Sequence, residues 1–263
     1  MSTPIPTFVR AILLIAFIVI YYRWFFVKVI DAIRAGMKIP ALDRRFPVRD
    51  VDGAIRLVFA AILQATFFSA LFFLYRPAML HVSSLDANPV LLVLASVLGV
   101  GEMALATLFG LSAIQVTDLI DRFRRLPPTD WPIVARGGWM QLYLKAIAIF
   151  PRWVVALIVL GYVGFEEAIF RGLIISVFVP LGIGLALFAS VCTFIVVQTF
   201  HTPGWRTAMF PAIGAAVMGT VHGLLFIAVP SIVPLALAHA SFFVAMLWAS
   251  GGLLRQRRVD ICA

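Results

Sequence analysis

Two adjacent acids and an arginine four residues later carry the first chemical signal in the sequence. Glu166, Glu167 and Arg171 lie together inside an apolar segment. On a helix, Glu167 and Arg171 share a face and can pair, whereas Glu166 lies about 100° further round. Glu166 is then left without an obvious partner in its own helix and could serve as a general base. The alternative is that both acids pair with Arg171 and only tie helices together.

Three histidines lie in or at the end of later apolar segments. His201 ends one such segment, and His222 and His239 lie within the next two. A single helical histidine more often packs than catalyses, but several beside buried acids change that balance. Imidazole and carboxylate can together orient and deprotonate a water molecule. The residue types therefore predict activation of water.

The acidic residues divide by type. Every Asp lies in a loop, at a segment end or in the tail, whereas the three Glu residues, Glu102, Glu166 and Glu167, lie within apolar segments. A charged group near the centre of a bilayer costs at least about 2.5–3.5 kcal/mol. Such residues are candidates for function, although structural ion pairs also occur. Glu102 could line the same cavity or neutralise a cation such as Arg10.

The composition indicates which solvent surrounds these residues. The chain of 263 residues is 63% hydrophobic and 13% charged, whereas soluble domains carry about 25% charged residues. Lipid must therefore be the main solvent. The net charge of +9 comes from cations in short loops, where anionic lipid headgroups attract them. We expect membrane lipids as partners and no nucleic acid.

Seven apolar segments are interpreted as membrane-spanning helices, because backbone polar groups in lipid must bond within their own helix. They are residues 8–29, 55–75, 88–117, 152–179, 181–200, 207–227 and 230–252. The predicted fold is all-α, a polytopic transmembrane helical bundle of about seven spans. Residues 1–130 would form amino-terminal helices without a motif, and residues 140–254 would form the catalytic core.

Basic residues predict the orientation. They concentrate in the loops 31–53 and 118–141 and in the carboxyl-terminal tail, and positive loops stay in the cytoplasm. We therefore expect a multi-pass protein of the plasma (inner) membrane, with the amino end outside and the carboxyl end in the cytoplasm. The amphipathic stretch Trp139–Arg152 would lie along the inner surface.

The order of the motifs resembles one family. A Glu-Glu-x-x-x-Arg run at Glu166, a His-x-Pro about thirty residues later at His201, and a final histidine at His239 are similar to the CPBP family of CAAX proteases and bacteriocin-processing membrane proteins. The resemblance covers roughly residues 150–250. It implies a helical intramembrane endopeptidase with a cavity open to the cytoplasm, acting on prenylated or other membrane-bound peptides.

The resemblance also implies roles for single residues. Glu166 and His201 would activate water, Arg171 would hold Glu167, and His239 would stabilise the tetrahedral oxyanion. Zinc is an open question: Glu166, His201 and His239 could bind it with one position free, but direct activation of water by Glu and His needs no metal.

Two positions depart from the family pattern. Val197 stands where the family usually has Phe, four residues before the second-motif histidine. Phe243 stands where the family usually has Asn or Asp, four residues after the last histidine, and it supplies no donor. Loss of one oxyanion donor costs about 100- to 1000-fold in rate. Gln198 is a candidate substitute, on nearly the same face as His201.

Two other function classes stay open. An inactive relative acting as an immunity factor or membrane scaffold is favoured by Phe243. A proton-coupled transporter would also use buried Glu and His, but the sequence shows no inverted repeat or paired interrupted helices.

Overall fold

The computed structural model describes residues 6–36, 45–77, 88–127, 129–131, 134, 140–200, 202 and 204–249. Within these residues every regular element is helical, which confirms the all-α prediction. The elements are α1 (Thr7–Ile20), η1 (Tyr21–Phe25), α2 (Phe26–Gly36), α4 (Val48–Tyr75), α5 (Pro89–Phe123), α7 (Met140–Ile149), α8 (Arg152–Glu167), η2 (Ala168–Ile175), α9 (Ser176–Phe178), η3 (Val179–Leu181), α10 (Ile183–Thr199), α11 (Trp205–Ala228) and α12 (Ile232–Ala249).

Helices occur at all seven predicted segments. Five are long and apolar enough to cross a membrane: Thr7–Ile33, Asp50–Tyr75, Pro89–Phe123, Arg152–Leu181 and Trp205–Ala228. The apolar helices Ile183–Thr199 and Ile232–Trp248 are shorter, within 10–17 residues. At 1.5 Å per residue, such a helix reaches about 26 Å, slightly less than the hydrocarbon core. The protein is a polytopic helical membrane protein.

The span that carries the two acids changes its winding directly after them. α8 ends at Glu167, and the next eight residues, Ala168–Ile175, form the π-helical segment η2. A π turn bonds each residue to the fifth along and often marks a functional site. Every residue of η2 is buried. Gly182, with a φ of 122° that side chains rarely adopt, then turns the chain into α10.

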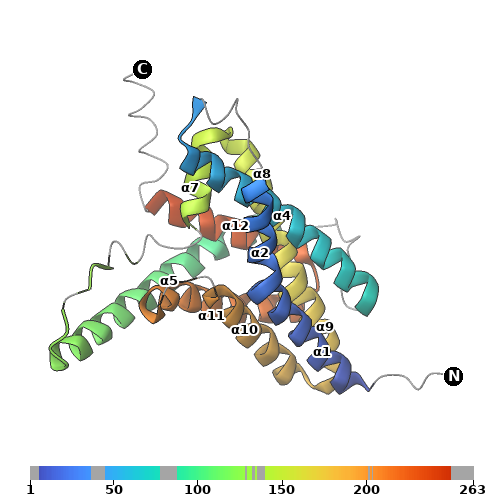
Figure 1. Cartoon of the computed structure of the whole chain (residues 1–263). Coiled ribbons are helices and arrows are strands. Elements are labelled where there is room, and N and C mark those ends of the chain that lie inside the picture. Colours follow the sequence, from blue (N-terminus) through green and yellow to red (C-terminus); the bar gives the residue numbers. More distant parts are fainter. Residues whose placement is uncertain are drawn as a thin grey trace.

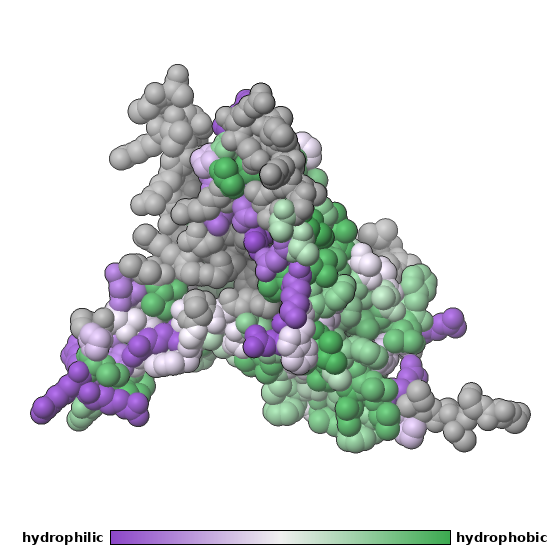
Figure 2. All heavy atoms as spheres, in the orientation of Figure 1, coloured by the Kyte–Doolittle hydropathy of each residue, from purple (hydrophilic) through white to green (hydrophobic). Residues whose placement is uncertain are grey.

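Helices from different parts of the chain pack around this span (Figure 1). α5 and α8 both pack against α12, and α10 packs against α11 and η2. α4 packs against α8 on another side and also against α7. Figure 1 shows α5 diverging from α1 and α4, and Figure 2 shows hydrophilic side chains gathered at the far end of α5. The span α8–η2 is therefore surrounded by α4, α10 and α12, which can all supply side chains to it.

The amphipathic stretch predicted at Trp139–Arg152 contains α7, which ends before Pro151. Its inner face is buried through Tyr143, Ala146 and Ile147. This face packs against α4 and α8. α7 is therefore part of the packed bundle on one side, with Ala148 exposed on the other.

Candidate active site

Glu167 contacts charged or basic side chains from three helical elements, η2, α11 and α12. Its Oε1 lies 2.7 Å from His239 Nδ1 on α12, and its Oε2 lies 3.1 Å from His222 Nδ1 on α11. Arg171 Nε lies 3.2 Å from the same Oε2. Glu167 and Arg171 have no exposed side-chain surface. The structure therefore contains the Glu167–Arg171 pair that the helical spacing predicts, enlarged by two histidines.

An aromatic ring completes the surroundings of Arg171. The guanidinium carbon lies 4.2 Å from the centroid of the Phe194 ring on α10. A cation over a ring face is stabilised, most of all where water is excluded. Arg171 is thus held between a carboxylate of its own span and an aromatic ring of the next helix.

Glu166 has neutral partners. Gln198 Nε2 on α10 donates to Glu166 Oε1 at 3.2 Å. Tyr162, one turn earlier on α8, is a second neutral neighbour of Glu166. No partner for Glu166 within its own helix was predicted from the sequence, and Tyr162 corrects this prediction. The i to i+4 spacing of Tyr162 and Glu166 would have indicated that they are neighbours. The ion pair of Arg171 is with Glu167, so the structure supports separate surroundings for the two acids.

Two further residues join this buried network from outside the expected motif. His222 Nε2 lies 3.1 Å from Glu102 Oε2 on α5, and both residues are almost fully buried. Glu102 therefore pairs with His222, and the suggested pairing with Arg10 is wrong: Arg10 donates to the backbone oxygen of Tyr75. The two residues are 120 positions apart, so no local spacing could reveal their contact.

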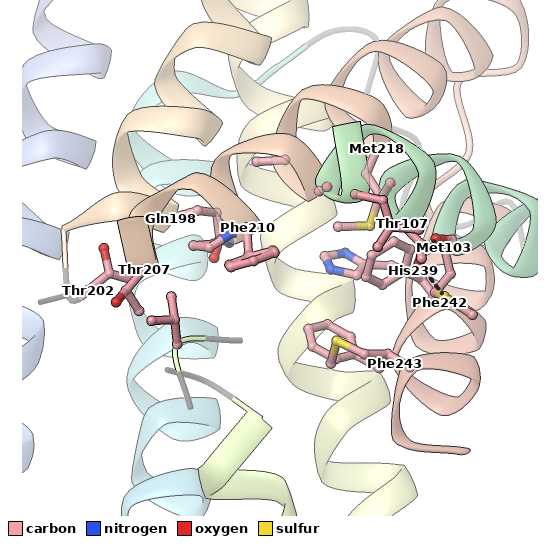
Figure 3. A pocket seen from close by; sticks show the side chains of 18 of the residues that line it. Met103, Thr107, Gln198, Thr202, Thr207, Phe210, Met218, His239, Phe242 and Phe243 are labelled. Atoms are coloured by element: carbon pink, nitrogen blue, oxygen red, sulfur yellow. Dashed lines mark hydrogen bonds between the residues drawn. The ribbon is translucent and has the colours of Figure 1, made fainter. Parts of the chain in front are cut away.

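A cavity of about 410 Å³ borders the network. It is lined by α5, α11, α12 and the end of α10, and most lining side chains are apolar. Gln198 and His239 are its main polar groups, together with Thr107, Thr202 and Thr207. Figure 3 shows Gln198 and His239 on opposite sides of this space. On the side away from the cavity, Gln198 is hydrogen-bonded to Glu166, and His239 is hydrogen-bonded to Glu167.

Phe243 bounds the histidine side of the cavity. The Phe243 ring stacks on His239, with centroids 5.3 Å apart and planes 12° apart. Tyr143 of α7 packs on Phe243 at 5.0 Å. Burial, together with the nearby charge of Glu166, raises the pKa of the Tyr143 hydroxyl well above its usual value. The hydroxyl therefore stays a neutral donor at physiological pH.

His201, the predicted partner of Glu166 in water activation, lies outside the described residues. The structure brings Glu166, Glu167, Arg171, Gln198 and His239 into one region. Among the residues that the structure describes, no group of three or more His, Cys, Asp or Glu is arranged to hold a metal ion. The zinc set suggested by the sequence includes His201, so that set stays a prediction.

Comparison with known proteins gives one match. Residues 148–245 match the family of type II CAAX prenyl endopeptidases, Rce1-like. This segment contains the two acids, Arg171, Gln198, His222 and His239, but not Glu102. No curated protein and no solved structure was found to match the chain.

Proposed function

We propose that the protein hydrolyses a peptide bond of a membrane-associated, lipidated protein or peptide, because residues 148–245 match the family of type II CAAX prenyl endopeptidases. The observation that carries the proposal is the pair of polar groups across the cavity, Gln198 and His239, each backed by a buried glutamate. A pocket of this size and apolar lining fits a peptide segment with an apolar attachment.

In the proposed reaction Glu166 acts as the general base for the attacking water molecule, with His201 as its partner. Its neutral neighbours leave the carboxylate free of an ion pair that would hold the negative charge. His239 faces the carbonyl of the substrate and stabilises the oxyanion, because Nδ1 is taken by Glu167 and Nε2 remains for the cavity. Zinc held by Glu166, His201 and His239 is a variant of this proposal in which the metal would polarise the water.

The first experiment measures cleavage by the purified protein in lipid vesicles. The probe is a fluorescent peptide that ends in a farnesylated Cys-aliphatic-aliphatic-X sequence, with the non-prenylated peptide alongside. Wild type should cleave, and Glu166→Gln should lose about 100-fold or more of the rate while it still folds. Wild-type turnover that does not exceed that of Glu166→Gln would overturn the proposal. Chelator treatment of the wild type tests the zinc variant separately.

The same proposal includes a location. We propose a plasma-membrane protein with its carboxyl end in the cytoplasm, which the basic loops support, and with the cavity open to that side, as the family resemblance implies. Labelling of single cysteines introduced near residue 130 and near residue 80, in intact cells and in opened cells, measures the orientation. Labelling near residue 130 in intact cells would contradict it.

A second function is favoured by two side chains at the site. Phe243 covers one face of His239 where the family usually has an amide or acid. Phe194 stands four residues before Gln198, so the family's Phe-to-His spacing is met with Gln198 in the histidine position. Gln198 cannot accept a proton as imidazole can. These two replacements favour a relative that binds a lipidated peptide in the cavity without cutting it, as an immunity factor or scaffold would.

The double variant Gln198→His with Phe243→Asn distinguishes the two functions. If the natural protein only binds, the double variant should gain cleavage that the wild type lacks, and the wild type should still retain the prenylated peptide. If the wild type already cleaves through Glu166, the binding-only function is excluded. Retention of the prenylated peptide is measured by co-flotation with vesicles, and Phe210→Trp, which narrows the cavity, serves as the blocked control.

A further inference from the structure

Four buried side chains form a continuous row across four helices. Glu102 Oε2 lies 3.1 Å from His222 Nε2, and His222 Nδ1 lies 3.1 Å from Glu167 Oε2. Glu167 Oε1 in turn lies 2.7 Å from His239 Nδ1. The row runs from α5 through α11 and α8 to α12, and its last member lines the cavity.

The row constrains how each ring is turned. His222 has a carboxylate near each ring nitrogen: Nε2 makes a hydrogen bond with Glu102 Oε2, whereas Nδ1 lies 3.1 Å from Glu167 Oε2 in charge contact, without the geometry of a hydrogen bond. Glu167 then receives contacts from His222, His239 and Arg171 on its two oxygens. The hydrogen bond from His239 is on Oε1, while the charge contacts of Arg171 and His222 are both on Oε2, and these contacts favour one orientation of the carboxylate. It therefore fixes the Nδ1–H tautomer of His239 and leaves Nε2 for the cavity.

The backbones of α5 and α12, which carry the two ends of the row, lie in direct contact. A Cβ added at Gly99 would overlap the carbonyl oxygen of Ala238, so the two helices touch there through their backbones. Ala238 directly precedes His239, and Gly99 lies one turn before Glu102. The close approach therefore fixes the distance between the two ends of the row. Gly101, on another face of α5, has open space around it.

We propose that Glu102 and His222 are positioning residues, which hold Glu167 and through it keep His239 Nε2 directed into the cavity. Neither residue touches the substrate. The effect on catalysis rests on the proposed function, whereas the effect on His239 does not. Glu102 lies outside the matched family segment, so this part of the site is supplied by the amino-terminal helices.

The test is nitrogen NMR of protein labelled with ¹⁵N in histidine, in lipid nanodiscs. Signals are assigned by single replacement of each of the four histidines. In the wild type, His239 should show a protonated Nδ1 and an unprotonated Nε2. Glu102→Gln should shift the signals of both His222 and His239 and give His239 a mixture of tautomers. The matched control is Asp121→Asn, another buried acid on α5 that pairs with Arg206; it should leave both rings unchanged.

Cleavage of the farnesylated probe gives the second readout. Glu102→Gln should lower kcat about 10-fold with KM little changed, the size of effect seen when the group that orients a reactive side chain is lost. Asp121→Asn should keep the wild-type kcat. A structural role alone would lower the amount of folded protein and leave kcat per folded molecule unchanged.

The outcomes separate the two proposals. Unchanged His222 and His239 signals in folded Glu102→Gln would overturn the positioning role, whatever the activity. If the wild type cleaves nothing but the signals shift as expected, the positioning role stands and the peptidase proposal fails. Should Glu102→Gln not fold, Glu102→Asp, which keeps the charge but withdraws it by one methylene, must show the same shifts in smaller degree, and their absence would count against the role.

Discussion

The two adjacent glutamates have different surroundings. Glu167 lies among charged or basic groups, with Arg171, His222 and His239 in contact. Glu166 lies among neutral groups, with Tyr162 and Gln198 as partners, and borders the cavity wall. Successive residues on a helix point about 100° apart, so each acid meets different helices. The difference supports a structural role for Glu167 and the proposed catalytic role for Glu166.

The largest expected effect is the loss of stability when Glu167 is replaced. Glu167→Gln leaves the fully buried Arg171 without its counter-ion, and removal of one partner of a buried pair costs about 3–5 kcal/mol. The measurement is the free energy of unfolding in mixed micelles of a mild detergent and a denaturing one. Expression and elution as a single folded species should fall in parallel.

The neighbouring substitution is the matched control. Glu166→Gln keeps the shape and can keep the contact with Gln198, so we expect a change in the free energy of unfolding of under about 1 kcal/mol. Equal losses of stability for the two variants would contradict the division of roles between the acids.

The second prediction concerns the missing donor on the cavity side. Phe243→Asn puts an amide one turn after His239, and one oxyanion donor is worth about 100-fold in rate at the low end. We expect kcat for the farnesylated probe to rise toward that factor. The stack of Phe243 on His239 is lost at the same time, so Phe243→Leu, which removes the ring and adds no donor, is the control. A gain in Phe243→Leu equal to that in Phe243→Asn would show that the donor is not the cause.

The third prediction concerns the contact between the amino-terminal helices and the site. Gly99→Ala forces α5 away from the backbone of Ala238, and overpacking of this kind costs about 1–3 kcal/mol. Gly101→Ala meets open space and should be neutral or stabilising by up to about 1 kcal/mol, because alanine favours helix. Both free energies of unfolding are measured in the same micelles. Equal effects would mean that the close approach does not position α5.

Local spacing accounts for the part of this architecture that could be predicted from the sequence. Long apolar segments predicted the helices, because backbone polar groups in lipid must form hydrogen bonds within their own segment. The i to i+4 spacing gave the Glu167–Arg171 pair. The same rule would have given Tyr162 as a partner of Glu166.

Contacts between helices could not be predicted in the same way. The sequence analysis did not connect Glu102, which could line the cavity or neutralise a cation such as Arg10, with His222, because nothing in a sequence states which helix faces meet. Their contact depends on how α5 packs against α11. The contact of Gln198 with Glu166 likewise depends on how α10 packs against α8 and η2. The position of His201 relative to Glu166 stays a prediction.

The smallest expected effect comes from an ion pair at the far end of α5, which sharpens the contrast with the core. Arg206 Nη2 lies 2.8 Å from Asp121, and the arginine side chain keeps 31% of its surface exposed. Because water reaches Arg206, although the Asp121 side chain keeps only 7% of its surface exposed, Arg206→Gln should cost about 1 kcal/mol in the free energy of unfolding, less than Glu167→Gln. The salt dependence of the cost distinguishes the two ion pairs more clearly than the magnitude of the cost does. Raising the salt concentration from about 0.1 M to about 1 M shortens the screening length from about 10 Å to about 3 Å, so the cost of Arg206→Gln should largely vanish. The cost of Glu167→Gln should persist, since no ion can approach a pair without exposed surface. If both costs shrank alike, the Glu167–Arg171 pair would have to be in contact with solvent, and the distinction between a structural and a reactive glutamate would lose its physical basis.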